Sequence, residues 1–259
     1  MMGDFLDFCQ NSGIVLQKGG KAEMNENQLV LRPMGDSAIV AELGQKMDQE
    51  THFRVKALAA ALKKNPFRGM TGYVPAFTTL TVFYDPLSFS FTEMSRRLQS
   101  LAEDIGTGEE LQPKVVEIPV CYGGEFGPDL PFVAEYNKLS PEEVIRIHAS
   151  GEYLVYMIGF APGFPYLGGM SERIAAPRKP SPRVKVPAGS VGIAGKQTGI
   201  YSLDSPGGWQ LIGRTPLSLF RVDRNPPGLL EMGDIVRFRP ISRAEYERWE
   251  AGGNHAYQR

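Results

Sequence analysis

The chain has 259 residues, enough for two domains, and 42% of them are hydrophobic against 22% charged, a globular rather than a disordered composition. The net charge of −1 argues against binding to nucleic acid or to an anionic membrane. The two cysteines, Cys9 and Cys121, form neither a CxxC motif nor a Cys/His cluster, so we expect neither a disulfide framework nor a zinc site. No apolar run approaches the ~20 residues of a membrane span. We therefore expect a soluble, cytoplasmic protein.

The first 27 residues carry no sustained hydrophobic periodicity, and the patterned sequence begins only at Leu29. Codons for residues 18–20, Lys-Gly-Gly, can resemble a bacterial ribosome-binding site, and Met24 follows at a suitable distance. We expect residues 1–27 to be a disordered or mis-annotated N-terminal extension, with translation starting at Met24 in the second case.

Residues 28–106 alternate between strand and helix patterns. Strands are predicted at 29–31, 38–43 and 78–84, and helices at 48–64 and from Ser90 onward. Ser90, with Glu93 three residues later, forms a capping box that marks a helix start. This order favours a ferredoxin-like α/β sandwich.

Residues 107–114 are polar, contain Gly and Pro and lack periodicity, which predicts a linker. Beyond it, short strands punctuated by Gly and Pro predict a β-barrel or sandwich over residues 115–241, and so an α+β protein overall. The apolar run 153–158 is expected to be a strand buried on both faces. Helix starts are predicted at Ser140 and at Ser242, the latter within a C-terminal helix and tail at residues 242–259.

Three clusters in the second domain could form a site. The first, residues 159–169, combines Gly and Pro with flat apolar side chains at Phe160, Phe164 and Tyr166. Such a loop could line a ligand site, or its aromatic side chains could only plug the barrel, and the residues do not decide between these.

The second cluster, residues 187–201, offers neutral hydrogen-bonding groups at Ser190, Gln197, Thr198 and Tyr201. We interpret its glycines as places of close backbone approach, and Gln197, Thr198 and Tyr201 as binding residues.

The third cluster, residues 205–216, contains Trp209, expected in the core or a pocket wall, and Arg214, which could pair with an anion.

Charge suggests an anion site. Between Arg173 and Lys196 the chain carries six basic residues and no Asp or Glu. Such a stretch could bind phosphate or carboxylate, or could be a solvated face or a contact with another polypeptide. His148 could act as a general acid/base, although a lone histidine on a helix is more often structural. No catalytic triad or metal-ligand set can be assembled by spacing.

Three segments carry a family resemblance: GFAPGFPYLGG, VPAGSVGIAGKQTGIYSLDSPGGWQLIGRTP and the earlier LRPMGDSAIVAELG. Together they resemble the family of 5-oxoprolinase B subunits, also called allophanate hydrolase subunit 1 and Kip inhibitor of sporulation kinase. The likeness runs from Leu29 to Pro240. It implies a ferredoxin-like domain, a cyclophilin-like β-barrel, and the A and C subunits of 5-oxoprolinase as partners. With them the chain would open 5-oxo-L-proline to L-glutamate at the expense of ATP.

The resemblance suggests roles for the candidate residues. The proposed anion and ATP ligands are Arg178, Arg183, Lys185 and Arg214. The lactam would contact Gln197, Thr198 and Tyr201, with Ser190 nearby and Phe160, Phe164, Tyr166 and Trp209 as walls. His148 would be the proton-transfer residue. Magnesium would accompany ATP rather than occupy a protein cage, and no protein-bound metal or prosthetic group is expected.

Rival functions remain open. The chain could inhibit a sporulation-type sensor histidine kinase by blocking its autophosphorylation, as the family includes such members. Biotin-dependent carboxyl transfer to urea-derived substrates is a second alternative. Prolyl isomerase activity is a third, suggested only by the likeness to cyclophilins, and fold alone does not carry function.

Overall fold

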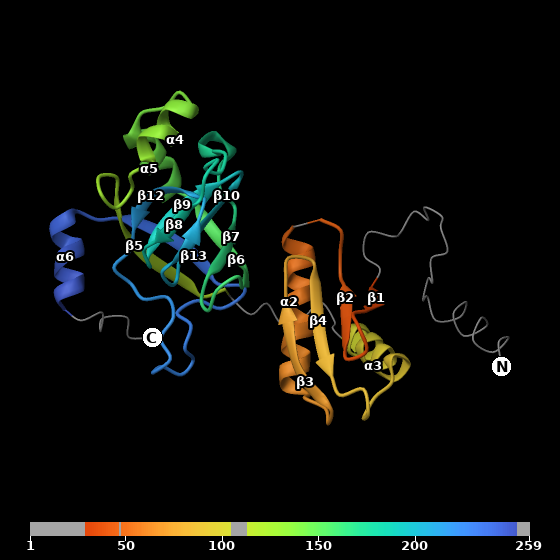
Figure 1. Ribbon diagram of the computed structural model, residues 1–259. Helices are drawn as coiled ribbons and strands as arrows, with labels where there is room; N and C mark the ends of the chain where they lie inside the picture. The colour runs from red at the N-terminus through yellow and green to blue at the C-terminus, as the bar shows by residue number, and fades with distance from the viewer. Residues whose placement is uncertain (1–28, 47, 105–112, 253–259) are drawn as a thin grey trace. The chain divides into compact units, whose positions relative to one another are not determined.

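The computed structural model describes residues 29–46, 48–104 and 113–252 and divides into two compact units, residues 1–111 and 112–259 (Figure 1). The division falls inside the segment predicted as a linker. The expected N-terminal extension, residues 107–112 of the linker and the last seven residues lie outside the described residues.

The first unit is a four-stranded antiparallel sheet with two helices. Its elements are β1 (Val30–Pro33), β2 (Ala38–Glu42), α2 (Gln49–Lys64), β3 (Met70–Pro75), β4 (Thr79–Tyr84) and α3 (Phe91–Asp104), and the strand order is β1-β2-β4-β3. The element order is therefore ββαββα, whereas a ferredoxin-like domain has βαββαβ. Moving β1 to the end of the order would convert one into the other, so the ferredoxin-like prediction is not confirmed in its detail.

Local signals explain most of these elements. Asp48 caps α2 by accepting a hydrogen bond from the Thr51 backbone at 2.8 Å. The Ser90 backbone donates to Glu93 at 2.9 Å, as the predicted capping box requires. The sequence pattern did not predict strand β3, because Met70–Pro75 contains Gly and Pro, which are uncommon inside strands.

The second unit is built around a closed seven-stranded barrel, which confirms the predicted barrel. Its strands are β5 (Val115–Tyr122), β6 (Glu152–Ile158), β7 (Pro165–Gly168), β9 (Ser190–Ala194), β10 (Gln197–Ile200), β12 (Gln210–Arg214) and β13 (Ile235–Pro240). They close in the order β10-β7-β6-β13-β5-β12-β9, with β13 and β5 parallel and the other neighbours antiparallel.

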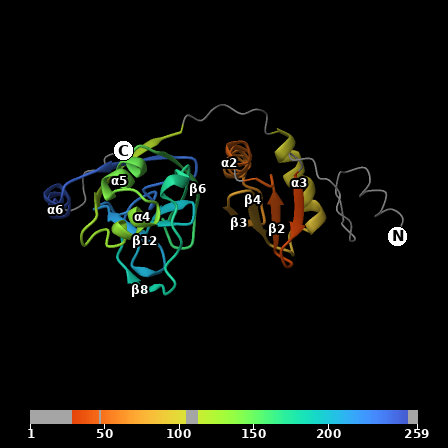
Figure 2. The ribbon, with the colours of Figure 1, turned by 90° about the horizontal axis from the view of Figure 1, so that it is seen from above.

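Helices and a short ribbon surround this barrel. They are α4 (Leu130–Tyr136), α5 (Pro141–Ala149), the 3-10 turn η1 (Glu172–Ile174), α6 (Arg243–Ala251), and the two-stranded ribbon of β8 (Arg183–Val186) and β11 (Ser205–Gly207). Helix α5 begins with the predicted capping box of Ser140 and Glu143. Figure 2 shows α6 outside the barrel wall, and α6 packs against β5. Among the described residues, no helix has the length and apolar character needed to cross a bilayer.

Strand β6 corrects one prediction. We expected residues 153–158 to be buried on both faces, but only Tyr153 and Val155 are fully buried. The alternate residue Leu154 is half-buried, and so are residues 156–158. The strand therefore has one core face, because neighbouring side chains of a strand point to opposite sides.

The barrel wall has two apolar faces. Inside, Val191, Ile193 and Ile200 belong to the barrel core. Because neighbouring residues alternate, Ala194 and Tyr201 point outward, and both belong to a second buried cluster. Val186 of the β8–β11 ribbon completes that cluster, so the ribbon covers the outer face of the wall.

Candidate functional site

An aromatic cluster lies on the outer face of the wall formed by β7, β10, β9 and β12. Phe164 is at its centre, with its ring centroid 5.6 Å from that of Tyr201 and 5.8 Å from that of Trp209, both edge to face. Tyr166 packs against Phe164 at 5.1 Å and is half-buried. These predicted wall residues thus come together, outside the barrel rather than as its plug.

Two glycines of the second motif make room for the indole. A Cβ at Gly199 would lie 3.0 Å from Cζ3 of Trp209 and 3.3 Å from Cζ of Phe164. A Cβ at Gly192 would lie 3.1 Å from Cβ of Trp209. The interpretation of these glycines as sites of close approach therefore agrees with the geometry, and the approaching group is an aromatic ring.

The polar candidates of the second motif divide between the two faces of the wall. Gln197 and Tyr201 alternate with the inward-pointing Thr198 and Ile200, so they share the outer face with the aromatic cluster. Gln197 is half-buried, and its side chain makes no hydrogen bond within the described part of the chain. Burial raises the pKa of Tyr201, partly offset by a hydrogen bond with the Trp209 backbone and by the nearby charge of Arg178.

Ser190 is fully buried on the outer face, and its hydroxyl has no hydrogen-bond partner among the described residues. Burying a hydroxyl group without a hydrogen-bond partner destabilises the folded state. Because no part of Ser190 is exposed, the structure does not present it to a ligand.

His148 and Thr198, two of the predicted site residues, form an internal hydrogen-bond chain. The Thr198 hydroxyl donates to the Gly192 carbonyl at 3.1 Å, so it accepts from Nε2 of His148 at 2.9 Å. Nδ1 of His148 then accepts from the Tyr122 hydroxyl at 2.8 Å. Burial lowers the pKa of His148 to about 3, so the ring is neutral at pH 7. Both side chains are fully buried and hydrogen-bonded inside the barrel, so the structure exposes neither of them to a ligand.

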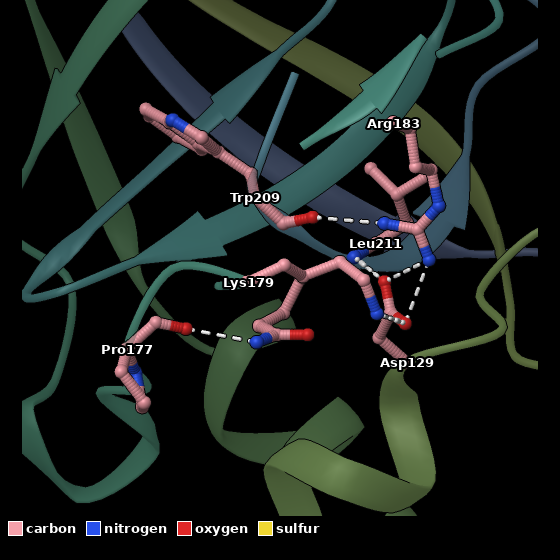
Figure 3. Close-up of polar contacts among 7 residues, drawn as sticks. Asp129, Pro177, Lys179, Arg183, Trp209 and Leu211 are labelled. Carbon is pink, nitrogen blue, oxygen red and sulfur yellow. Dashed lines mark hydrogen bonds and ion pairs between the residues drawn. The ribbon is translucent and has the colours of Figure 1, made fainter. Parts of the chain in front are cut away.

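Arg183 is held by a carboxylate that the sequence analysis missed. One terminal nitrogen of Arg183 lies 2.7 Å from each oxygen of Asp129, and the other donates to the Trp209 carbonyl at 3.3 Å (Figure 3). Asp129 also accepts from the Leu211 backbone at 2.7 Å and from Lys179 at 3.2 Å. Burial alone would raise the pKa of Asp129, but these hydrogen bonds outweigh it and the pKa is lowered. The guanidinium of Arg183 is therefore engaged by Asp129 and the Trp209 carbonyl in this structure.

The other predicted cations differ in availability. Lys185 pairs with Asp204 at 2.7 Å on the surface. Arg214 lies over the Phe126 ring, 5.3 Å from its centroid, with its Nε buried. Arg178 is exposed and has no ion pair in the described ranges, so it is the predicted cation best placed to meet an anion.

The sequence around Asp129 carries part of the information needed to find this residue. Asp129 precedes α4, which has a proline in its first turn, a combination typical of a helix start. Its side chain makes no cap hydrogen bond and instead binds Arg183, 54 residues away. Local pattern therefore could have located the helix but not the partner.

The arrangement is suited to binding. It offers aromatic surface, the unpaired amide of Gln197 and the guanidinium of Arg178, whose charge reaches Tyr201. The described residues contain no group of three or more His, Cys, Asp or Glu side chains able to hold a metal ion. With His148 inside the barrel, the outer face presents no proton-transfer group from the predicted set.

Comparison with known proteins identifies the family. A family model described as "Carboxyltransferase domain, subdomain C and D" matches residues 29–230. The chain is 53% identical over 234 residues to the 5-oxoprolinase B subunit of Bacillus subtilis (strain 168), covering 86% of this chain and 98% of the relative. The chain belongs to the family of 5-oxoprolinase B subunits. Another member, from Escherichia coli O157:H7, is 45% identical over 210 residues, covering 80% of this chain and 94% of its own length.

A solved structure extends the comparison. The protein TTHA0988 is 41% identical in sequence with a TM-score of 0.71, over 79% of this chain. The aligned region spans only 40% of the TTHA0988 chain. The region that aligns with this chain is therefore part of a longer polypeptide in TTHA0988.

Proposed function

We propose that this chain is the B subunit of an ATP-dependent 5-oxoprolinase, which together with the A and C subunits opens 5-oxo-L-proline to L-glutamate. The observation that carries the proposal is the 53% identity to a protein of that name over 98% of its length. The chain is non-autonomous in this proposal, because the described outer face supplies binding groups while His148, the predicted proton-transfer residue, lies inside the barrel.

The chemistry of 5-oxoproline fits the groups on this face. Its lactam has one N–H donor and one carbonyl acceptor, and a glutamine amide can accept from the first and donate to the second. We assign that contact to Gln197. The carboxylate of the substrate would pair with Arg178, whose charge already acts on nearby Tyr201. Tyr166 would provide an apolar wall for the ring.

Most of the cations predicted to bind ATP already have partners within the described part of the chain. Of the four cations predicted to bind ATP, Arg183 and Lys185 bind carboxylates and Arg214 packs on Phe126. We therefore propose that ATP and its magnesium bind chiefly to the companion subunits, and we assign no phosphoryl-transfer step to this chain. TTHA0988 supports a composite enzyme, since its longer polypeptide contains the same module.

Reconstitution tests the proposed function. The full chain is mixed with purified A and C subunits, and glutamate released from 5-oxoproline is measured with and without ATP. We expect release only with all three proteins and ATP. Equal release when this chain is omitted would refute the assignment.

One other function has specific support. The matching family model is described as a carboxyltransferase domain, which favours biotin-dependent carboxyl transfer as a second candidate. Avidin, which sequesters biotin, would abolish such activity and leave a 5-oxoprolinase unaffected. Inhibition of a sensor histidine kinase stays a prediction, and it is tested by adding the purified chain to a kinase autophosphorylation assay.

A further inference from the structure

The β8–β11 ribbon continues the β9–β10 hairpin and is bent back over the outer face of the wall. The pairing of Ser205 with Val186 in the ribbon keeps the register of the β9–β10 pairing. The two ladders are interrupted at residues 187–189 and 201–204, and Gly189 has a φ of +80°, which favours glycine. A few loop residues that lie side by side in this way can act as a hinge between two rigid segments.

Few buried groups hold the ribbon against the barrel. In its two strands, only Val186 is buried. The main polar link is Arg183 of β8, which binds the Asp129 carboxylate and the Trp209 carbonyl (Figure 3). The side chain of Arg183 is 24% exposed, so water competes for this link. A segment with few buried apolar contacts opens at a lower free energy than the core, so the ribbon can open while the barrel stays folded.

Three predicted site residues lie beneath the ribbon or beside its hinge. Tyr201 is 3% exposed, and a Cβ on Gly207 of β11 would overlap its hydroxyl oxygen. Trp209 is 7% exposed, with its ring centroid 6.3 Å from that of Tyr201. Ser190 adjoins Tyr201, whose backbone N–H donates to the Ser190 carbonyl at 2.9 Å. Opening of the ribbon would uncover these groups and give the unpartnered Ser190 hydroxyl a hydrogen bond from water or a ligand.

We propose that the β8–β11 ribbon is a lid, latched by the Arg183 ion pair, and that its opening admits the lactam of 5-oxoproline to Tyr201. The inference rests on the proposed function, since the ligand is the substrate assigned there. With the lid closed, a ligand reaches Gln197 and Tyr166, which are half-buried, and Phe160, which is 70% exposed. With the lid open, the ring of Tyr201 offers a flat wall, and its hydroxyl can donate to the lactam carbonyl.

Thiol labelling at two adjacent positions tests whether the lid opens. Ser190→Cys places a thiol on the covered outer face, and Val191→Cys places one inside the barrel, each in the full chain with Cys9→Ser and Cys121→Ala. Labelling should be at least ~100-fold faster in Ser190→Cys, because a local opening exposes this position and leaves the barrel closed. Equal labelling rates would overturn the inference, since the outer face would then become accessible only when the barrel unfolds.

Substitutions on β8 test the latch. Arg183→Ala removes the link to Asp129, whereas Lys185→Ala removes an ion pair with Asp204 that joins β8 to the segment before β11. Arg183→Ala should raise the labelling rate of Ser190→Cys about 10-fold, the effect of losing one part-buried ion pair, and Lys185→Ala should leave it unchanged. Arg183→Lys, which keeps the charge but not the forked geometry, should fall between them. Equal labelling in all of these variants would show that the Arg183 ion pair is no latch.

Kinetics of the reconstituted enzyme test what the lid admits. Arg183→Ala should lower KM for 5-oxoproline by the same factor of about 10, because a ligand that binds only the open form binds more tightly when that form is more populated. Tyr201→Phe should raise KM about 10-fold, the effect of losing one hydrogen bond to the substrate.

The outcomes separate the lid from the proposed function. An unchanged KM beside faster labelling in Arg183→Ala would overturn the inference, because substrate binding would then not depend on the opening. Absence of glutamate release with the wild-type chain would refute the proposed function and the ligand named here, while the labelling rates would still decide whether the ribbon opens.

Discussion

Asp129 joins segments that are distant in the chain. Its carboxylate is 8% exposed and binds Arg183 of β8, Lys179 and the backbone of β12. Arg183 extends the link to the carbonyl of Trp209. The ion pair therefore fastens the ribbon over the aromatic cluster, and we regard Asp129 as a positioning residue for the outer face.

Asp129→Asn should destabilise the protein by about 2 kcal/mol, less than for a fully buried pair because Arg183 is partly exposed. The pKa of Asp129 is lowered on folding, so its contribution is present above the unfolded pKa of about 4 and is lost as pH falls through the folded value. Urea unfolding of wild type and variant should therefore differ at pH 7 and converge in acid. Asp223→Asn, which removes an exposed partner of Arg221, is the matched control and should leave Tm unchanged.

His148 should make the protein less stable as the pH is lowered. Its pKa is lowered to about 3 in the folded state against about 6.5 unfolded, so the unfolded chain binds the extra proton between these values. Stability is therefore lost as pH drops below about 6.5, by up to about 1.4 kcal/mol per pH unit. His148→Phe should reduce this slope in urea unfolding between pH 6.5 and 4. An unchanged slope would show that His148 is protonated in the native protein.

The β9–β10 hairpin presents a flat surface against which the indole of Trp209 packs. Gly192 and Gly199 remove side chains where the indole meets the wall, while Val191, Ile193 and Ile200 fill the barrel on the other side. One strand pair therefore serves two cores, and each of its faces has a different size requirement.

Gly199→Ala should cost about 1–3 kcal/mol, because the new methyl group would overlap with Trp209 and Phe164. Thermal unfolding measures the cost, and a shift in tryptophan emission would report the displaced indole. Gly72→Ala is the control, since a Cβ there has nothing within 4 Å and the residue also lies in a strand. Equal stability of the Gly199→Ala and Gly72→Ala variants would show that Trp209 does not pack closely against Gly199.

The second unit has a barrel that is filled inside and a candidate binding face on the outside of its wall. The predicted proton-transfer residue lies in the filled interior, and the amide and guanidinium groups lie outside. In the function proposed above, this face would hold part of the substrate, and the A and C subunits would supply the remaining catalytic groups.

Gln197→Ala should lower kcat/KM for 5-oxoproline about 10-fold in the reconstituted enzyme, the effect of losing one hydrogen-bonding side chain. Tm and the affinity for the C subunit should stay at wild-type values, because the side chain of Gln197 makes no hydrogen bond to a described residue. Gln99→Ala on α3 is the control. Unchanged kinetics for Gln197→Ala would remove this residue from the substrate site.

Many elements follow from residues a few positions apart. The capping boxes of Ser90 with Glu93 and of Ser140 with Glu143 form as expected, since each needs only one helical turn. The alternation in β4 and β13 likewise reveals strands with one core face. The motifs indicated the family for a similar reason, because each of them is contiguous in the chain.

The assignment of side chains to the inside or outside of the barrel depended on closure of the seven strands. Thr198 and Gln197 are neighbours with similar hydrogen-bonding chemistry, yet one joins His148 in the core and the other faces out. Residue pattern could not separate them, since a strand of small and polar residues gives no hydrophobic alternation. The pairing of Arg183 with Asp129 also required the fold, because the two lie 54 residues apart and local chemistry cannot specify a contact at that separation. The sequence by itself therefore determined helix starts and strand patterns. Long-range packing decided which side chains lie on the outer face of the barrel.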